Sequence, residues 1–266
     1  MRGEEIRRRL SRVKCFMLDM DGTFYLGNQL LEGSLDFLSR LSQTGRTNLF
    51  VTNNSSKSAK VYEEKLARMG VGERYREVLT SGQAAGSYCL REMAGKKAFV
   101  LGNDMLREEL TQMGVAIDDQ HPDYVLIGYD TTLDYGKMTA VCDLVRAGLP
   151  YIATHPDFNC PTETGFAPDI GAIIAFIEAS AGRRPDLIIG KPYGGIVEEA
   201  LKKTGLQKEE LAMVGDRLYT DVATGLNFGI LSILVLTGEA SLRDVEEGDV
   251  KPDLIFERLS SMNEYL

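Results

Sequence analysis

The chain has 266 residues, which suits one large domain or two smaller ones with a substantial core. Its formal net charge of −9, from 39 acidic and 30 basic residues, disfavours a nucleic-acid partner, because nucleic-acid backbones require clustered Lys and Arg. No apolar run is long enough to span a bilayer, and the charged N-terminus lacks the apolar stretch of a signal peptide. We therefore expect a cytoplasmic protein with no membrane partner. The four cysteines form no C-x-x-C pair, which is typical of reduced, buried thiols.

Short apolar runs alternate along the chain with amphipathic segments that stop at glycine. This rhythm predicts an α/β fold, a doubly wound (Rossmann-like) parallel sheet whose strands are covered on both faces. The expected strands cover residues 15–18, 48–51, 98–101, 124–127, 151–153, 187–189, 211–214 and 230–235. Because these βα units exceed what one small sheet holds, we expect two α/β domains, one inserted into the other.

One segment interrupts this rhythm. Residues 23–26 and 29–31 flank Gly27-Asn28, a two-residue hairpin signal placed where a doubly wound fold would start a helix. The sequence therefore predicts a small flap over the end of the sheet.

Two carboxylates directly follow the first expected strand. Asp19 and Asp21 stand two residues apart, and Gly22 permits a sharp turn. Ligands of open α/β sheets bind outside the carboxyl ends of the strands, which places Asp19 at a ligand site. For this stretch alone, an ordinary Asp-Gly turn is an equal alternative.

Three further strand ends carry polar side chains. Thr52-Asn53-Asn54 precedes a helix and offers an anion receptor or a simple N-cap cluster. Lys191 follows an apolar strand and is either a fixed charge beside a phosphate or an exposed loop lysine. Asp216 and Asp221 follow another strand and are either ligands or capping and surface aspartates.

Together, the four strand ends bring Asp, Thr, Lys and Asp to the same edge of one parallel sheet. Asp19 and Asp216 would repel each other unless a cation lay between them, and Mg²⁺ prefers such oxygen ligands. An imidazole-based zinc site is disfavoured, because His121 and His155 are the only histidines.

These motifs, in this order, resemble the haloacid dehalogenase-like (HAD) phosphatases, whose signature is DxDGT, a strand-end Ser/Thr, a Lys and GDxxxD. The matching positions are Asp19 to Thr23, Thr52, Lys191, and Gly215-Asp216 with Asp221. The stretches VTNNS, IGKP and GDRLYTD are similar to the NagD-like, 4-nitrophenyl phosphatase branch. The resemblance covers nearly the whole chain.

The resemblance implies a catalytic core at residues 1–81 and 186–266 and an α/β cap for substrate specificity at residues 82–185. It also implies a Mg²⁺-dependent phosphatase that hydrolyses small phosphate monoesters, such as sugar phosphates or nucleotides. We expect a monomer or a homodimer.

The family's residue roles carry over by motif position. Asp19 would be the nucleophile, forming an aspartyl phosphate, and Asp21 the general acid and base. Lys191, Thr52, Asn53 and Asn54 would hold the phosphate. Mg²⁺ would bind the side chains of Asp19 and Asp216 and the backbone carbonyl of Asp21, with Asp221 orienting metal-bound water or Lys191.

Two alternative functions stay open. A phosphotransferase or phosphomutase of the same superfamily would pass the phosphoryl group to an acceptor other than water. A phospho-receiver module shares the acidic pocket, strand-end Thr and Lys, but the chain length and Asp21 argue against it. A dinucleotide-binding dehydrogenase lacks support, because no G-x-G-x-x-G follows a strand.

Three other features suggest ordinary structural roles. We interpret His155-Pro156-Asp157 as a plain turn and Phe176 as part of the core. The Arg7–Arg9 run is interpreted as a solvated face.

Overall fold

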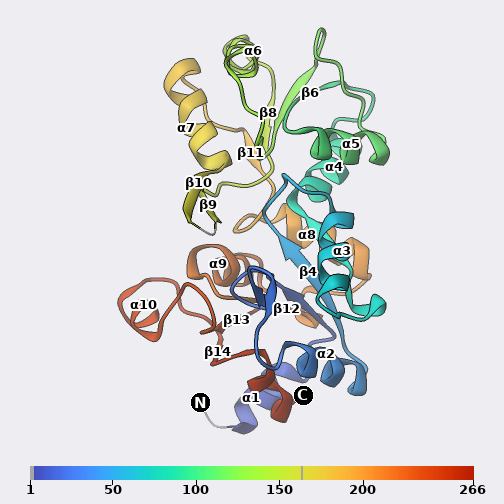
Figure 1. Ribbon diagram of the computed structural model, residues 1–266, viewed down its shortest axis with the longest axis vertical. Helices are drawn as coiled ribbons and strands as arrows, with labels where there is room; N and C mark the ends of the chain where they lie inside the picture. The colour runs from blue at the N-terminus through green and yellow to red at the C-terminus, as the bar shows by residue number, and fades with distance from the viewer. Residues whose placement is uncertain (1–2, 163) are drawn as a thin grey trace. The chain divides into compact units, whose positions relative to one another are not determined.

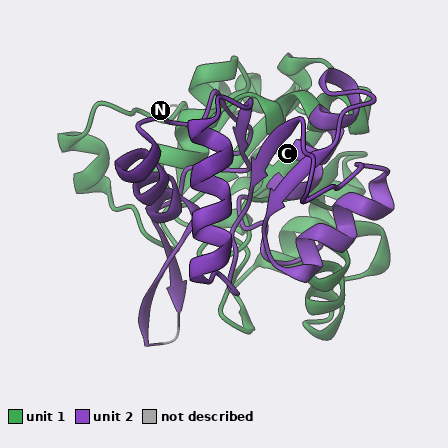
Figure 2. Ribbon diagram, turned by 90° about the horizontal axis from the view of Figure 1, so that it is seen from above, with its two compact units in different colours: residues 1–52, 60–79, 191–266 green, residues 53–59, 80–190 purple. Residues whose placement is uncertain are grey.

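The computed structural model describes residues 3–162 and 164–266 (Figure 1). The chain divides into two compact units, coloured separately in Figure 2. The first unit comprises Met1–Thr52, Lys60–Leu79 and Lys191–Leu266, and the second comprises Asn53–Ala59 and Thr80–Gly190. A parallel sheet lies in each unit, so the predicted α/β class is confirmed.

The first unit is built on a six-stranded sheet in the order β14-β13-β12-β1-β4-β5. Its strands are β1 (Cys15–Leu18), β4 (Thr47–Thr52), β5 (Val78–Thr80), β12 (Leu211–Gly215), β13 (Leu231–Val235) and β14 (Leu254–Phe256). β1 lies inside the sheet and pairs in parallel with β12 on one side and β4 on the other. Every residue of β1 and β12 is buried, which explains their uniformly apolar sequences.

Helices and a small hairpin complete the first unit. The α-helices are α1 (Gly3–Leu10), α2 (Ser34–Gln43), α3 (Ala59–Arg68), α8 (Gly195–Thr204), α9 (Ala223–Phe228) and α10 (Leu242–Glu247). Short 3₁₀ helices cover Glu73–Tyr75, Lys208–Glu210 and Leu259–Tyr265, and Leu218–Val222 is π-helical. The hairpin pairs β2 (Tyr25–Leu26) with β3 (Gln29–Leu30) and confirms the predicted strand–turn–strand segment at Gly27-Asn28.

The second unit has a four-stranded parallel sheet in the order β11-β8-β7-β6. Its strands are β6 (Ala98–Leu101), β7 (Tyr124–Ile127), β8 (Tyr151–Ala153) and β11 (Leu187–Ile188). Its helices are α4 (Ser81–Glu92), α5 (Asp104–Met113), α6 (Tyr135–Arg146) and α7 (Ile170–Ala181). An antiparallel hairpin of β9 (Asn159–Thr162) and β10 (Gly165–Pro168) precedes α7.

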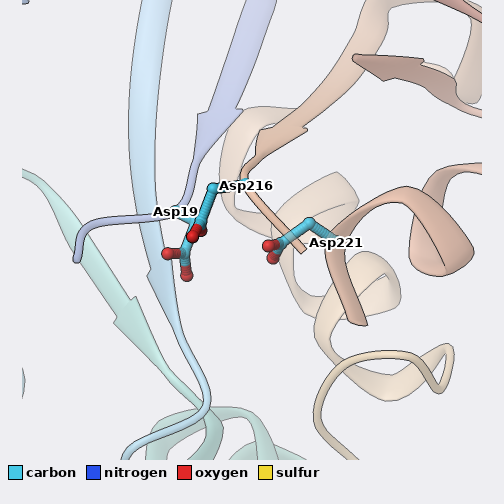
Figure 3. A group of neighbouring side chains, drawn as sticks. All are labelled: Asp19, Asp216 and Asp221. Carbon is cyan, nitrogen blue, oxygen red and sulfur yellow. The ribbon is translucent and has the colours of Figure 1, made fainter. Parts of the chain in front are cut away.

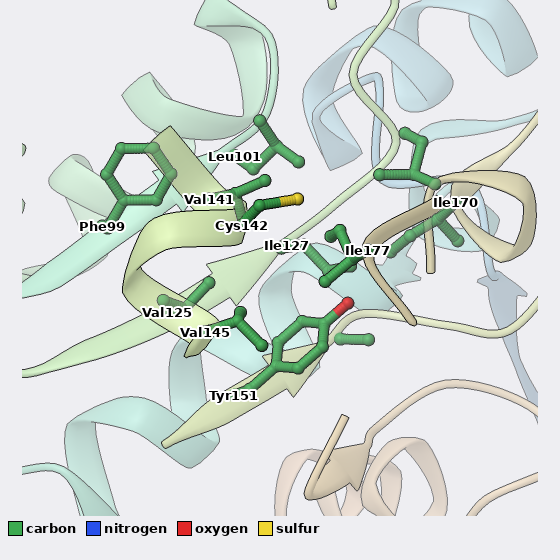
Figure 4. Close-up of a cluster of buried hydrophobic side chains, with 12 residues drawn as sticks. Phe99, Leu101, Val125, Ile127, Val141, Cys142, Val145, Tyr151, Ile170 and Ile177 are labelled. Carbon is green, nitrogen blue, oxygen red and sulfur yellow. The ribbon is translucent and has the colours of Figure 1, made fainter. Parts of the chain in front are cut away.

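The core of the second unit joins its sheet to α6 and α7 (Figure 4). Alternate residues of β6, β7 and β8 share this cluster, as expected when successive strand side chains point to opposite faces. The buried members are Phe99, Leu101, Val125, Ile127, Val141, Cys142, Val145, Tyr151, Ala153, Ile170, Ile173 and Ile177. Phe176, predicted to be core, is 40% exposed, because it lies one position away from the buried stripe of α7.

The structure corrects three further expectations. The strand at residues 187–189 was expected in the same sheet as β1, β4 and β12, but β11 pairs with β8 in the second unit. Strands β5, β9, β10 and β14 were missed, because they are short and β9 and β10 contain proline and polar residues. Cys160 is only partly buried, whereas the other three cysteines are buried.

Replacing Ile177 by Ala should lower the free energy of unfolding by about 2–5 kcal/mol, because it leaves a cavity beside fully buried neighbours. Phe176→Ala, on the exposed side of the same helix, is the matched control and should cost less than about 1 kcal/mol. Urea unfolding followed by circular dichroism measures both values. Equal destabilisation by the two variants would contradict this packing.

Candidate active site

Three neighbouring strands end at one edge of the first unit's sheet. In the register of the sheet, Leu18 of β1 lies opposite Val214 of β12 and Phe50 of β4. Asp19 therefore emerges beside Asp216, which follows β12, and beside Thr52, which ends β4 and is only 9% exposed. Parallel pairing alone thus brings Thr52 and Asp216 beside Asp19, although they lie 33 and 197 positions later in the sequence.

Three carboxylates gather at this edge. One oxygen from each of Asp19, Asp216 and Asp221 lies within 4.8 Å of the others (Figure 3). Asp216 and Asp221 are buried, and Asp19 is partly exposed. Asp221 comes from the π-helical turn that follows β12, which directs its side chain back toward the strand end.

Lys191 neutralises part of this negative charge. Its Nζ donates to Asp19 Oδ1 at 2.5 Å and to Asp221 Oδ1 at 2.7 Å, and lies 3.4 Å from the Val51 carbonyl oxygen. The lysine is 3% exposed, a position tolerated by an ammonium only when it is paired. Lys191 therefore links the ends of β1 and β4 to the turn after β12.

Two glycines make this crowding possible. Gly22 has a φ of 85°, and a Cβ there would lie 2.4 Å from Asp216 Oδ2. A Cβ at Gly215 would lie 2.1 Å from Asp221 Cγ. Gly22 is therefore favoured both by its left-handed backbone and by the lack of space, and Gly215 by the lack of space alone.

The carboxylates are costly to ionise together. Burial raises the pKa of Asp19 to about 7; Lys191 opposes this rise, and the charges of Asp221 and Asp216 add to it. Burial and the charge of Asp221 likewise raise the pKa of Asp216 to about 6, against the lowering by the Glu239 N–H and Arg217. Burial lowers the pKa of Lys191, but the charges of Asp19 and Asp221 outweigh it and raise the pKa overall.

The donor set fits a divalent cation that prefers oxygen ligands. Three carboxylates and one lysine leave two uncompensated negative charges, which a dication would balance. Both Asp221 oxygens already accept protein hydrogen bonds, from Lys191 Nζ and the Arg217 N–H. The Asp216 oxygens also accept hydrogen bonds, from the Thr23 hydroxyl and the Glu239 N–H, so protein donors orient both carboxylates.

The remaining predicted residues lie in different surroundings. Asp21 is exposed, at the base of the β2–β3 hairpin, where it forms an isolated bridge with Tyr25. Asn53 and Asn54 belong to the second unit. There the Asn53 amide donates to the Asp157 carboxylate at 3.2 Å, and Asn54 Oδ1 accepts from the Ser56 N–H at 2.9 Å.

Sequence reasoning missed two polar groups. Arg217 pairs with Glu239 at 3.0 Å, and the carboxylates of Asp19, Asp221 and Asp216 help to raise its pKa against the effect of burial. His155, interpreted as part of a plain turn, is fully buried and lies 3.1 Å from Asp169, a buried polar pair that this interpretation did not include. The sequence could have indicated Arg217 only through its position next to Asp216.

Two family models match the chain. One, described as "Haloacid dehalogenase-like hydrolase", matches residues 16–116, and another, described as "HAD-hyrolase-like", matches residues 188–262. Asp19, Asp21 and Thr52 lie in the first match, and Lys191, Asp216 and Asp221 lie in the second.

Known proteins are similar over nearly the whole chain. The acid sugar phosphatase of Staphylococcus aureus (strain MRSA252) is 38% identical over 94% of this chain and 97% of its own. The structure of 4-nitrophenylphosphatase from Thermotoga maritima is 46% identical and superimposes with a TM-score of 0.92 over 96% of this chain and 98% of the other. NagD from E. coli K-12 is 32% identical, with a TM-score of 0.85 over 93% and 97% of the two chains.

Among the described residues, no helix combines the length and the apolar character needed to cross a membrane.

The metal-free protein should lose stability as pH rises from about 4 to about 7. Folded Asp19 and Asp216 hold protons more tightly than their ordinary pKa of 3.8 allows, so the folded state binds more protons than the unfolded state in this range. Melting temperatures measured with a chelator present should therefore fall with pH more steeply for the natural protein than for Asp216→Asn. Identical pH dependences would contradict the shift assigned to Asp216.

Proposed function

Because the chain belongs to the haloacid dehalogenase-like hydrolases and is a phosphatase, we propose that it hydrolyses small phosphate monoesters through an aspartyl phosphate formed on Asp19. The observation that supports this most is the position of Asp19, whose carboxylate ends the inner strand β1 among Lys191, Asp216 and Asp221. A carboxylate held by a lysine at the carboxyl end of a parallel sheet is suited to meet a phosphate.

In the first step, an Asp19 oxygen attacks phosphorus and the bond to the leaving alkoxide breaks. Lys191 holds the nucleophilic carboxylate in place and places a positive charge where the transferring oxygens gather. Asp21, two residues along the chain and exposed, donates a proton to the leaving oxygen.

In the second step, Asp21 removes a proton from a water molecule, which attacks the phosphorus of the aspartyl phosphate. The carboxylate of Asp19 is released together with inorganic phosphate. The exposure of Asp21 supports this role, because a water molecule must reach its carboxylate once the leaving alcohol has departed.

We assign phosphate binding to Thr52, Asn53 and Asn54 together with Lys191. Thr52 stands at the carboxyl end of β4, and its hydroxyl and the following N–H groups are of the kind that bind anions. The Asn53 amide is held by Asp157, which favours its backbone N–H as the donor to phosphate.

Mg²⁺ is the proposed cofactor, held by Asp19, Asp216 and the backbone carbonyl of Asp21, with Asp221 orienting metal-bound water or Lys191. When bound, Mg²⁺ would neutralise charge on the phosphoryl oxygens and on the crowded carboxylates. The raised pKa values of Asp19 and Asp216 support this assignment, because burial and, in second place, the neighbouring carboxylates disfavour their charged forms, which a bound dication would stabilise.

The substrate is proposed to be a small phosphorylated metabolite such as a sugar phosphate. The name of the Staphylococcus aureus relative, an acid sugar phosphatase, supports this class. We assign the choice among such substrates to residues 82–185, which form most of the second unit and would act as the cap.

Replacing Asp19 by Asn should lower phosphatase activity by at least about 1,000-fold, because the amide cannot form the acyl phosphate. Release of 4-nitrophenol from 4-nitrophenyl phosphate in Mg²⁺ measures the rate. Asp249→Asn, at an exposed position, is the matched control and should keep full activity.

Circular dichroism of both variants should match that of the natural protein. Substantial turnover by Asp19→Asn would refute the nucleophile, and lasting labelling without turnover in the natural protein would indicate a receiver.

A further inference from the structure

The loop after β13 lies directly against Asp216 in the first unit. The Glu239 N–H donates to Asp216 Oδ2 at 2.8 Å, and the Ala240 N–H donates to the Asp216 carbonyl at 3.0 Å. A Cβ at Gly238 would lie 2.0 Å from the same Oδ2 atom, so the backbone itself forms the wall beside this carboxylate. The orientation of the Asp216 side chain therefore depends on where this loop is held.

The same loop is tied to the turn that follows Asp19. Thr237 Oγ1 donates to the Gly22 carbonyl at 2.7 Å, and Thr23 Oγ1 donates to Asp216 Oδ1 at 3.3 Å. The loop at residues 237–240, the turn at residues 21–23 and Asp216 thus form one connected set of polar contacts.

The side chain of Glu239 is anchored to the residues that follow Asp216. One of its carboxylate oxygens pairs with Arg217 Nε at 3.0 Å and accepts from the Tyr219 hydroxyl at 3.2 Å. Its backbone N–H meanwhile holds Asp216. One residue therefore contacts three positions of the segment at residues 216–219, although its side chain is 50% exposed.

We propose that Glu239 is a positioning residue for the metal site, which fixes the loop at residues 237–240 so that its N–H holds Asp216 in the metal-binding orientation. This inference rests on the proposed function, in which Asp216 is a Mg²⁺ ligand. Glu239 acts through its anchored side chain and its backbone, and it touches neither metal nor substrate.

The expected effect comes from the conformational entropy of Asp216, the metal ligand that the loop holds in place. Without the Glu239 carboxylate, Arg217 and Tyr219 lose their shared partner and the loop gains freedom, so Asp216 must be ordered when the metal binds. Partners that orient a metal ligand typically change affinity by about 10- to 100-fold, but a half-exposed ion pair has a smaller effect. We expect Glu239→Ala to raise the Mg²⁺ concentration for half-maximal effect about five- to tenfold.

Two Mg²⁺ titrations test this inference on the full chain, one following the melting temperature and the other following phosphatase activity. Both midpoints should rise together in Glu239→Ala and return toward the natural value in Glu239→Gln, which keeps an oxygen acceptor for the Tyr219 hydroxyl but not the charge that pairs with Arg217. Glu247→Ala is the matched control, because Glu247 forms an exposed ion pair with Arg243 on the same C-terminal segment. Its midpoints should equal those of the natural protein.

An unchanged midpoint in Glu239→Ala would overturn the inference, and so would a lower melting temperature in chelator without a change in midpoint. Tyr219→Phe removes only one anchoring hydroxyl and provides the same test if Glu239→Ala does not fold. Failure of the proposed metal site looks different, because the natural protein itself would then show no response to Mg²⁺.

Discussion

The arrangement of charged groups at the sheet edge around Asp19 depends on the buried contact between Lys191 and the carboxylates of Asp19 and Asp221. Three carboxylates this close would repel one another, and a buried ammonium would be equally unfavourable alone. Each charge is tolerated because the other is present. Lys191 offsets only part of the negative charge, and the proposed dication would balance the remainder.

The sheet supplies the geometry that this charge balance requires. β12, β1 and β4 are adjacent and parallel, so the residues after them meet at one edge without any contribution from flexible loops. Lys191 arrives differently, on the segment by which the chain returns from the second unit to the first. Local crowding then demands glycine at positions 22, 215 and 238, where any side chain would collide with Asp216 or Asp221. The aspartates of the acidic motifs can therefore pack this closely only because glycines lie next to them.

The sequence predicted strand ends better than it predicted strand partners. The apolar runs of β1, β6, β7 and β8 were located to the residue, because buried parallel strands are uniformly apolar. The same uniformity hides which sheet a strand joins, and β11 was therefore assigned to the wrong one. The aspartates and Lys191 could be identified from their positions after such runs. Glu239 could not, because its contact with Arg217 depends on a loop conformation that no spacing rule specifies.

Anomalous diffraction from crystals soaked in Mn²⁺, as a substitute for Mg²⁺, is the sharpest test of whether these strand ends form a metal-assisted phosphoryl-transfer site around Asp19. We expect one strong anomalous peak bonded to carboxylate oxygens of both Asp19 and Asp216, with Lys191 still in contact with Asp19. A fully occupied Mn²⁺ peak elsewhere, with none between these two aspartates, would contradict it.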